Sequence, residues 1–337
     1  MAQGPPLAQL SPGSQVSGTY LLNSVELGTT KNGQAFGKLI LGDPSGQVPG
    51  RLWDRAEELL APLEAGRAVK IRGRVDSFRG QAQVIVEHIE PTTAEPADFL
   101  PASPIAPEEL WQQLGKALRQ VHDRNLKQLL DLFFADQAFR NTFGRAPAAK
   151  AAHHAYVAGL LEHTASLATM AVAAADHYTH LDRDVLIAGA LLHDIGKTQE
   201  LTLGPPIDYT DQGRLMGHLV LGLDMLEKRL ARLPKFPAAT ADHLRHLIVS
   251  HHGFEQFGSP TKPKTPEAVA LHLLDDLDAK TAMVKEALAA RPEGQDWTAF
   301  HRLLERHLFT PAAETGAPAS TEPESEPTPE PTTPTLF

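Results

Sequence analysis

The sequence predicts a multidomain protein with an N-terminal β-barrel, an all-α domain behind it and a disordered C-terminal tail. Short strand-like runs separated by turn residues occupy the first quarter of the chain, and helical periodicity dominates from Ala148 onward. The last 27 residues hold seven Pro, six Thr and five Glu, a composition that cannot form a packed core. At 337 residues, the chain is long enough for two domains that each bury a core.

Composition limits the classes of function. The sequence contains no cysteine, which excludes disulfides and thiolate metal sites and fits a cytoplasmic location. No run of 18 apolar residues occurs, so we expect no membrane span, and the N-terminus lacks the features of a signal peptide. The net charge of −10 argues against a nucleic-acid partner, but residues 1–90 carry nine basic and nine acidic side chains. Charge alone therefore does not decide the partner.

The barrel domain is predicted over residues 14–92, after a flexible N-terminal segment, residues 1–13. Turns at Asn32-Gly33 and Asp43–Gly46 flank a strand-like run, and Ala56–Leu60 is predicted as one short helix. A later run alternates apolar with mostly basic residues and forms a hairpin around Arg79-Gly80. Three strands, a helix and two strands indicate an OB-fold barrel.

OB barrels commonly bind single-stranded nucleic acid with a basic groove and stacking aromatic rings. The residues of those two kinds that we offer as nucleic-acid contacts are Lys38, Arg51, Trp53, Lys70, Arg72, Arg74 and Phe78. The alternative is that Trp53 and Phe78 belong to the core and that the basic side chains form a solvated face.

Residues 93–147 are predicted as a linker with connector helices, and residues 148–310 as the all-α domain. A Pro/Ala/Thr-rich stretch is followed by helical patterns at Pro107–Val121 and Asn125–Phe134. The helices expected after Ala148 are one through His163 toward Ala175, Val185–Leu192 ending at a stop at Gly196, Gly217–Leu233, Pro237–Ser250, and one from Thr265-Pro266 to about Ala290. Residues 311–337 form the predicted tail.

The His193-Asp194 pair follows the apolar run Val185–Leu192, where a buried charged pair is costly unless it is satisfied. Of the 16 histidines, 11 lie between His153 and His252, a clustering typical of a metal site. Two metal ions need about six or seven protein ligands. The residues of suitable type in helical contexts are His163, His193, Asp194, His218, His251, His252 and Asp275. His153, His154, Asp276 and Asp278 remain open as structural or supporting residues.

A ligand set of histidine and carboxylate favours Mn, Fe, Ni, Co or Zn over Ca. Two such divalent ions, roughly 3.5–4 Å apart, can clamp the attacking and leaving oxygens of a phosphoryl transfer. Asp194 can bridge the two ions, and Lys197 can hold a substrate phosphate or offset developing charge. We therefore place Asp194 and Lys197 as catalytic residues.

At this point the sequence resembles a known family. The stretches HHAYVAGLLEHT (153–164), LLHDIGKTQEL (191–201), GRLMGH (213–218), SHHG with GSP (250–260) and EAVALHLLDDLDAK (267–280) resemble the HD-domain metal phosphohydrolases. With an OB barrel in front, they are similar to the YhaM family of bacterial 3′–5′ exoribonucleases over about residues 14–310.

The resemblance implies Mn²⁺-dependent removal of 5′-nucleotides from the 3′ end of single-stranded RNA, with single-stranded DNA as a further substrate. It implies the same seven metal ligands, with Asp275 or Asp276 as the final aspartate. A nucleotide or cyclic-nucleotide phosphohydrolase is the alternative enzyme. A single-strand-binding module with a degenerate HD site is the alternative from another class. RNA against DNA preference, the metal and a homo-oligomeric state stay open.

Overall fold

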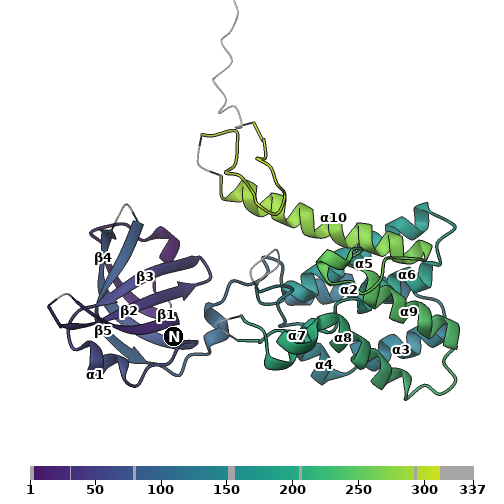
Figure 1. Ribbon diagram of the computed structural model, residues 1–337, viewed down its shortest axis with the longest axis horizontal. Coiled ribbons are helices and arrows are strands. Elements are labelled where there is room, and N and C mark those ends of the chain that lie inside the picture. The colour runs from purple at the N-terminus through teal and green to yellow at the C-terminus, as the bar shows by residue number, and fades with distance from the viewer. Residues whose placement is uncertain are drawn as a thin grey trace, which may run out of the picture. The chain divides into compact units, whose positions relative to one another are not determined.

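The computed structural model describes residues 4–30, 32–78, 81–150, 156–204, 207–291 and 294–311. The chain divides into two compact units, Met1–Met283 and Val284–Phe337. The first unit holds a β-barrel and a set of helices (Figure 1). His153, His154, Arg79-Gly80 and residues 312–337 of the predicted tail lie outside the described residues.

The barrel has five strands in the order β1-β2-β3-β5-β4, which confirms the OB-fold prediction. The elements are β1 (Gln15–Thr29), β2 (Ala35–Asp43), β3 (Gly46–Leu52), α1 (Ala56–Leu60), β4 (Arg67–Phe78) and β5 (Gln81–Pro91). β1 closes the barrel because its first half pairs with β4 and its second half pairs with β2. The pairs β1–β2, β1–β4, β2–β3 and β4–β5 are antiparallel, whereas β3 and β5 are parallel.

The alternation in β4 divides its side chains between core and solvent. Val69, Ile71 and Val75 are buried, while the basic residues between them are exposed. Because successive side chains of a strand point to opposite faces, this pattern fixes the register of the strand. The barrel core is therefore apolar, and its outer face carries the charge.

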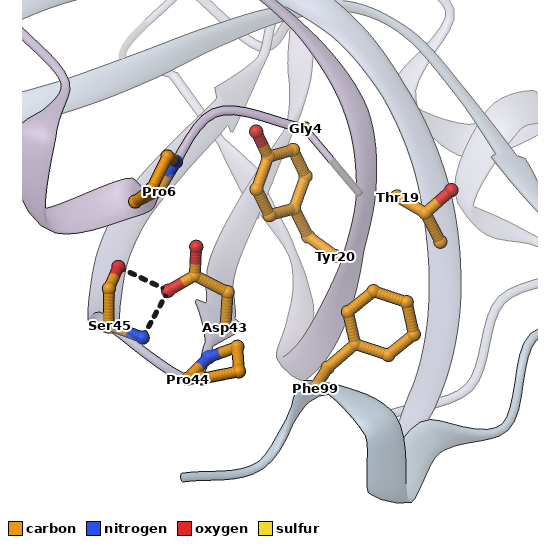
Figure 2. A pocket seen from close by; sticks show the side chains of 8 residues that line it. All are labelled: Gly4, Pro6, Thr19, Tyr20, Asp43, Pro44, Ser45 and Phe99. Atoms are coloured by element: carbon orange, nitrogen blue, oxygen red, sulfur yellow. Dashed lines mark hydrogen bonds between the residues drawn. The ribbon is translucent and has the colours of Figure 1, made fainter. Parts of the chain in front are cut away.

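The N-terminal segment differs from the expectation of a flexible arm over residues 1–13. Its described part forms a short 3₁₀ helix, η1 (Leu7–Gln9), and Leu7 is 1% exposed within the barrel core. The carboxylate of Asp43 accepts hydrogen bonds from the backbone N–H of Leu7 and, at the β2–β3 turn, from the N–H and hydroxyl of Ser45 (Figure 2). The Tyr20 hydroxyl donates to the carbonyl of Pro5 at 2.9 Å. Burying one leucine and satisfying a buried carboxylate hold this segment in place.

The helical part begins after η2 (Pro96–Phe99). Its elements are α2 (Pro107–Gln120), α3 (Arg124–Phe134), α4 (Gln137–Phe143), α5 (Gly159–His177), α6 (Arg183–Leu192), α7 (Lys197–Glu200), α8 (Asp211–Leu230), α9 (Ala238–Ser250), η3 (Glu255–Phe257) and α10 (Pro266–Ala289). From Val185 to Leu192 every residue of α6 is buried, as expected for a central helix. The sequence analysis did not predict α4. Among the described residues, no helix is long and apolar enough to span a membrane.

α8 begins six residues earlier than predicted and contains a break. Gly217 has φ +70° and ψ 162°, so the helical path is interrupted just before His218. A residue with a side chain rarely adopts this left-handed φ, which explains the glycine. His218 thus opens the second segment of the helix.

Candidate metal centre and nucleic-acid face

Five helices bring together all seven residues that the sequence analysis offers as metal ligands. They come from α5, the C-terminal ends of α6 and α9, the second segment of α8, and α10. In that order the residues are His163; His193 and Asp194; His251 and His252; His218; and Asp275. The site therefore joins positions more than 100 residues apart in the sequence.

The first group of ligand atoms comprises His163, His193 and Asp275. The Nε2 atoms of the two histidines are 3.2 Å apart. Asp275 Oδ1 lies 3.2 Å from His163 Nε2 and 4.0 Å from His193 Nε2. Two imidazoles and a carboxylate converge on one point, which is the arrangement of three ligands on one metal ion.

The second group comprises His218, His251 and His252, whose ring nitrogens lie within 4.8 Å of one another. The Nε2 atoms of His218 and His252 are 3.2 Å apart. Burial and the neighbouring His251 and His218 lower the pKa of His252 to about 3. His252 is therefore neutral at physiological pH, as a ligand must be.

Asp194 lies between the two groups. Its Oδ2 is 3.3 Å from His193 Nε2 in the first group. Its Oδ1 is 3.6 Å from the Nε2 atoms of His218 and His251 in the second. One carboxylate oxygen thus faces each group, an arrangement suited to a carboxylate that bridges two ions.

Two backbone carbonyls fix the histidines at the helix ends. The Nδ1 of His193 lies 2.9 Å from the carbonyl oxygen of Ala190, and the Nδ1 of His251 lies 2.8 Å from that of Ile248. A carbonyl only accepts, so each Nδ1 carries the proton and donates. Each Nε2 is therefore the ring nitrogen that faces the cluster.

Two carboxylates fix the rings of His163 and His218 in a similar way. His163 Nδ1 donates to Asp278 Oδ2 at 2.7 Å, and His218 Nδ1 donates to Glu200 Oε1 at 3.1 Å. Glu200 also accepts the backbone N–H of His218, which the break in α8 leaves without a helical partner. These outer partners set the orientation of both rings.

The donor set fits divalent cations. The Nε2 atoms of His218 and His252 face each other at 3.2 Å, although His252 is neutral and His218 donates through its other nitrogen. Asp194 Oδ1 and His251 Nε2 are buried and have no hydrogen-bond partner among the residues that the structure describes. Such unsatisfied buried atoms cost about 1–3 kcal/mol each, and a cation among them would satisfy both.

The charges around His163 also favour a cation. Burial by itself would lower the pKa of His163, but hydrogen bonds to Asp275 and Asp278 raise it to about 10. Burial opposes the ionisation of Asp194, yet the charges on Lys197 and His193 hold its pKa below the usual range. Protons and divalent cations therefore compete for this centre.

Gly196 and Lys197 lie two and three residues after Asp194. Lys197 Nζ is 2.6 Å from Asp194 Oδ2, so the lysine lies in the site and is paired with the bridging carboxylate. Gly196 was predicted to stop the helix of Val185–Leu192, but α6 already ends at Leu192, and Gly196, with φ −63°, directly precedes α7. A Cβ at Gly196 would lie 2.0 Å from the carbonyl oxygen of His218. The close approach to α8, rather than a helix stop, therefore explains the glycine.

Asp275 and Asp276 are separated by the structure. The Asp275 side chain is 18% exposed and faces His163. Asp276 pairs with Lys280 at 2.7 Å and is 44% exposed. Of the two, only Asp275 lies in the cluster.

On the barrel, aromatic and basic side chains share the outer face of β2 and β3. Trp53 stacks on Phe36 with ring centroids 5.0 Å apart, and Lys38 lies opposite Arg51 in the ladder. A pocket of about 420 Å³ is lined by Trp53 and Arg74, and also by the carboxylates Asp54 and Glu87. This face offers a stacking platform beside positive charge.

The remaining predicted contacts lie along β4. Lys70 pairs with Glu90 at 3.4 Å, Arg72 lies opposite His88, and Phe78 lies at the end of the strand. Phe78 is 57% exposed and Trp53 is 42% exposed, so the alternative that both belong to the core is wrong.

Named relatives match nearly the whole length of the chain. A protein from Bacillus velezensis (strain DSM 23117 / BGSC 10A6 / LMG 26770 / FZB42), named 3′-5′ exoribonuclease YhaM, is 34% identical over 315 residues, 92% of this chain and 99% of that protein. This chain belongs to the YhaM family. The protein of the same name from Bacillus subtilis (strain 168) is 33% identical over the same shares of both chains. Membership of the YhaM family confirms the resemblance drawn from the motifs.

Two family models match separate parts of this YhaM-family chain. An HD domain matches residues 160–280, and an OB-fold nucleic acid binding domain matches residues 21–92. The first range contains all seven candidate ligands, and the second contains all seven candidate nucleic-acid contacts. A solved OB-fold domain of replication protein A from Methanococcus maripaludis covers 26% of this chain and 94% of its own length, at 20% identity and a TM-score of 0.21, which is too low to bear on function.

Sequence reasoning missed one residue of the YhaM-family site. Glu200 is 8% exposed and holds His218 through both its backbone N–H and its ring. The only signal was a glutamate next to apolar Leu201 after the HD motif. For Asp278, left open from the sequence, the structure gives contacts with His163 and with the Ser166 hydroxyl.

Proposed function

We propose that this chain is a divalent-metal-dependent 3′–5′ exoribonuclease that removes 5′-nucleotides from the 3′ end of single-stranded RNA. The proposal rests on the two groups of candidate metal ligands and on the Asp194 carboxylate that lies between them. The relatives named 3′-5′ exoribonuclease YhaM support the polarity and the substrate.

His163, His193 and Asp275 would hold one ion, and His218, His251 and His252 the other, with Asp194 between them. When bound, the ions would activate a water molecule as nucleophile and neutralise charge on the phosphodiester. Nitrogen and carboxylate ligands without sulfur suit Mn²⁺, and the same donors accept Fe, Co, Ni or Zn.

The chain's own residues prepare the site. Lys197 keeps Asp194 ionised and has further N–H donors for a substrate phosphate. Glu200 and Asp278 hold the rings of His218 and His163 so that their Nε2 atoms point inward. The catalytic roles of Asp194 and Lys197 thus rest on their contact and on their place between the two groups.

The barrel would bind the single-stranded nucleic acid. Bases would stack on Trp53 and Phe78, and phosphates would contact arginine side chains such as Arg74. Stacking and charge do not distinguish RNA from DNA, so single-stranded DNA is a second substrate to test.

The deciding experiment uses a 5′-labelled single-stranded RNA and its DNA counterpart, with and without Mn²⁺. We expect a metal-dependent ladder that shortens from the 3′ end and disappears in Asp194→Asn. Asp276→Asn is the matched control because it removes a carboxylate on α10 that lies at the surface. Turnover of mononucleotides alone would move the assignment to a small-nucleotide phosphohydrolase. Binding of RNA without turnover in any metal would indicate a binding module.

A further inference from the structure

A second pocket lies in the helical part, and none of the seven candidate ligands lines it. It measures about 390 Å³ and is formed by the segment before α2, the ends of α2 and α4, and the residues before α5. We call it the connector pocket; its polar lining residues are Ser103, Arg140, Asn141 and Arg145. Its size is that of a small-ligand site.

The polar side of the connector pocket is cationic. The Arg140 guanidinium lies 4.0 Å from the centre of the Trp111 ring and donates one hydrogen bond to the Phe134 carbonyl. Arg145 is exposed and forms no ion pair with any described residue. Among the described residues that line the pocket, none is acidic. Two arginines without a carboxylate form a site for an anion, and the planar guanidinium suits phosphate.

Apolar side chains make up much of the rest of the lining. They are those of Ile105, Pro107 and Val157, together with Trp111, one face of which Arg140 covers. Apolar side chains in the same pocket as two guanidinium groups fit a ligand with an aromatic base and a phosphate. The side-chain amide of Asn141 adds a donor for such a ligand.

The wall beside α5 is held firmly. Ala158 has φ +65°, a strained conformation for a residue with a side chain. The bonds of its neighbours keep it there, because Val157 donates to the Pro101 carbonyl and accepts from Ser103. A preformed wall lowers the cost of ordering on binding.

A structural role explains Arg140 but not Arg145. Arg140 lies in the last turn of α4, where a cation is favourable, and it covers Trp111. Arg145 lies beyond the helix, and no side-chain hydrogen bond of it is seen among the described residues. Arg145 is therefore the residue that separates a binding site from a packing feature.

We propose that the connector pocket binds a nucleoside 5′-monophosphate group, with the phosphate on Arg140 and Arg145 and the base against the apolar side chains of Ile105, Pro107 and Val157. That group has two sources, a nucleotide within a bound strand or a free mononucleotide. The first source rests on the proposed exoribonuclease function, whereas binding of a free mononucleotide does not.

The test is calorimetric titration of the full chain with adenosine 5′-monophosphate in EDTA, which keeps phosphate binding by metal ions out of the measurement. We expect Arg145→Gln to weaken binding about tenfold or more, because a hydrogen bond between charged groups is lost. Arg145→Lys retains the charge, so its affinity for the nucleotide should lie between those of the parent and of Arg145→Gln. Arg124→Gln is the matched control, since Arg124 is also exposed and does not line the pocket. Adenosine and inorganic phosphate, as separate probes, should each bind more weakly than the nucleotide.

Steady-state turnover of a 20-nucleotide RNA with Mn²⁺ distinguishes the two sources. A raised KM in Arg145→Gln with unchanged kcat identifies a nucleotide of the strand, and an unchanged KM identifies the free mononucleotide. Equal binding of the mononucleotide to the parent, Arg145→Gln and Arg124→Gln would overturn the proposal. So would the absence of binding at millimolar nucleotide. Neither result depends on whether the chain degrades RNA.

Discussion

In the metal centre, hydrogen bonds fix the Nδ1 atoms of four histidine rings. His193 and His251 use the carbonyl three residues before them, so the end of the helix itself orients the ring. His163 and His218 use carboxylates from other helices. At the scale of single residues, the site therefore depends as much on these outer partners as on the ligands.

Asp275→Asn and Asp276→Asn should differ sharply. The first removes an anionic ligand atom 3.2 Å from His163, and the second removes half of a surface ion pair. We expect at least about a 100-fold loss of Mn²⁺-dependent RNA turnover for Asp275→Asn. We expect less than a twofold change for Asp276→Asn, given the small energy of exposed ion pairs. Equal losses in both variants would contradict the placement of Asp275 in the centre.

Glu200→Gln should weaken metal binding while leaving the fold intact. The amide keeps the shape and one acceptor oxygen, but it removes the negative charge that makes the His218 ring a better ligand. We expect about a tenfold higher Mn²⁺ concentration for half-maximal activity, with activity restored at saturating metal. Glu108→Gln, on the exposed face of α2, provides the control. A loss that saturating Mn²⁺ does not restore would show another role for Glu200.

At the scale of elements, two glycines position the metal centre in different ways. Gly217 adopts a left-handed φ that interrupts α8, and Gly196 leaves room for α8 to approach. Together they place the start of the second α8 segment beside the residues after α6. His218 then reaches the same centre as Asp194.

Gly196→Ala should destabilise the helical part and reduce activity. The added Cβ would lie 2.0 Å from the His218 carbonyl oxygen and 2.6 Å from the Gly222 nitrogen, both of which are backbone atoms that cannot rotate away. Overpacking of this kind costs about 1–3 kcal/mol in the free energy of unfolding. Thermal and urea denaturation measure it, with Gly204→Ala as the control because no atom of the described residues lies within 4 Å of its Cβ position. An unchanged midpoint would show that the helices separate without cost.

The order of strands and helices could be predicted from the sequence because turn residues and periodicity are local signals. The seven candidate ligands could be predicted because few other residue types bind divalent cations. α4 escaped prediction because seven residues cover fewer than two helical turns. Glu200 and the role of Gly196 escaped because each depends on a contact with α8, which no local pattern contains.

At the scale of the whole molecule, the net charge is −10, but residues 1–90, which include most of the barrel, carry equal numbers of basic and acidic side chains. Two of its lysines are paired with glutamates, Lys38 with Glu26 and Lys70 with Glu90. The candidate arginines of the outer face have no acidic partner among the described residues; they are Arg51, Arg72 and Arg74. The positive charge that is available to a nucleic-acid strand therefore comes from these three arginines, and the net charge of the chain does not reveal it.

The salt dependence of RNA binding should reflect those three arginines. For single strands, each neutralised phosphate contributes about −0.7 to the slope of log K against log salt concentration, so we expect a slope of about −2. Arg74→Gln should make it shallower by about 0.7. Binding of a labelled RNA without divalent metal, measured over a salt series, checks both values. A much steeper slope would indicate phosphate contacts outside the barrel.

The five-helix origin of the ligands has a further consequence for the lifetime of the protein. Because the seven side chains meet only when those helices are packed, an unfolded chain holds the ions far more weakly. Free metal at 100 times its dissociation constant would add about 2.7 kcal/mol per site to the free energy of unfolding. The melting temperature should therefore rise with Mn²⁺ in the parent and much less in Asp194→Asn, as calorimetric scans would show. Scarcity of metal would then make the chain easier to unfold, so that metal supply governs its abundance as well as its activity.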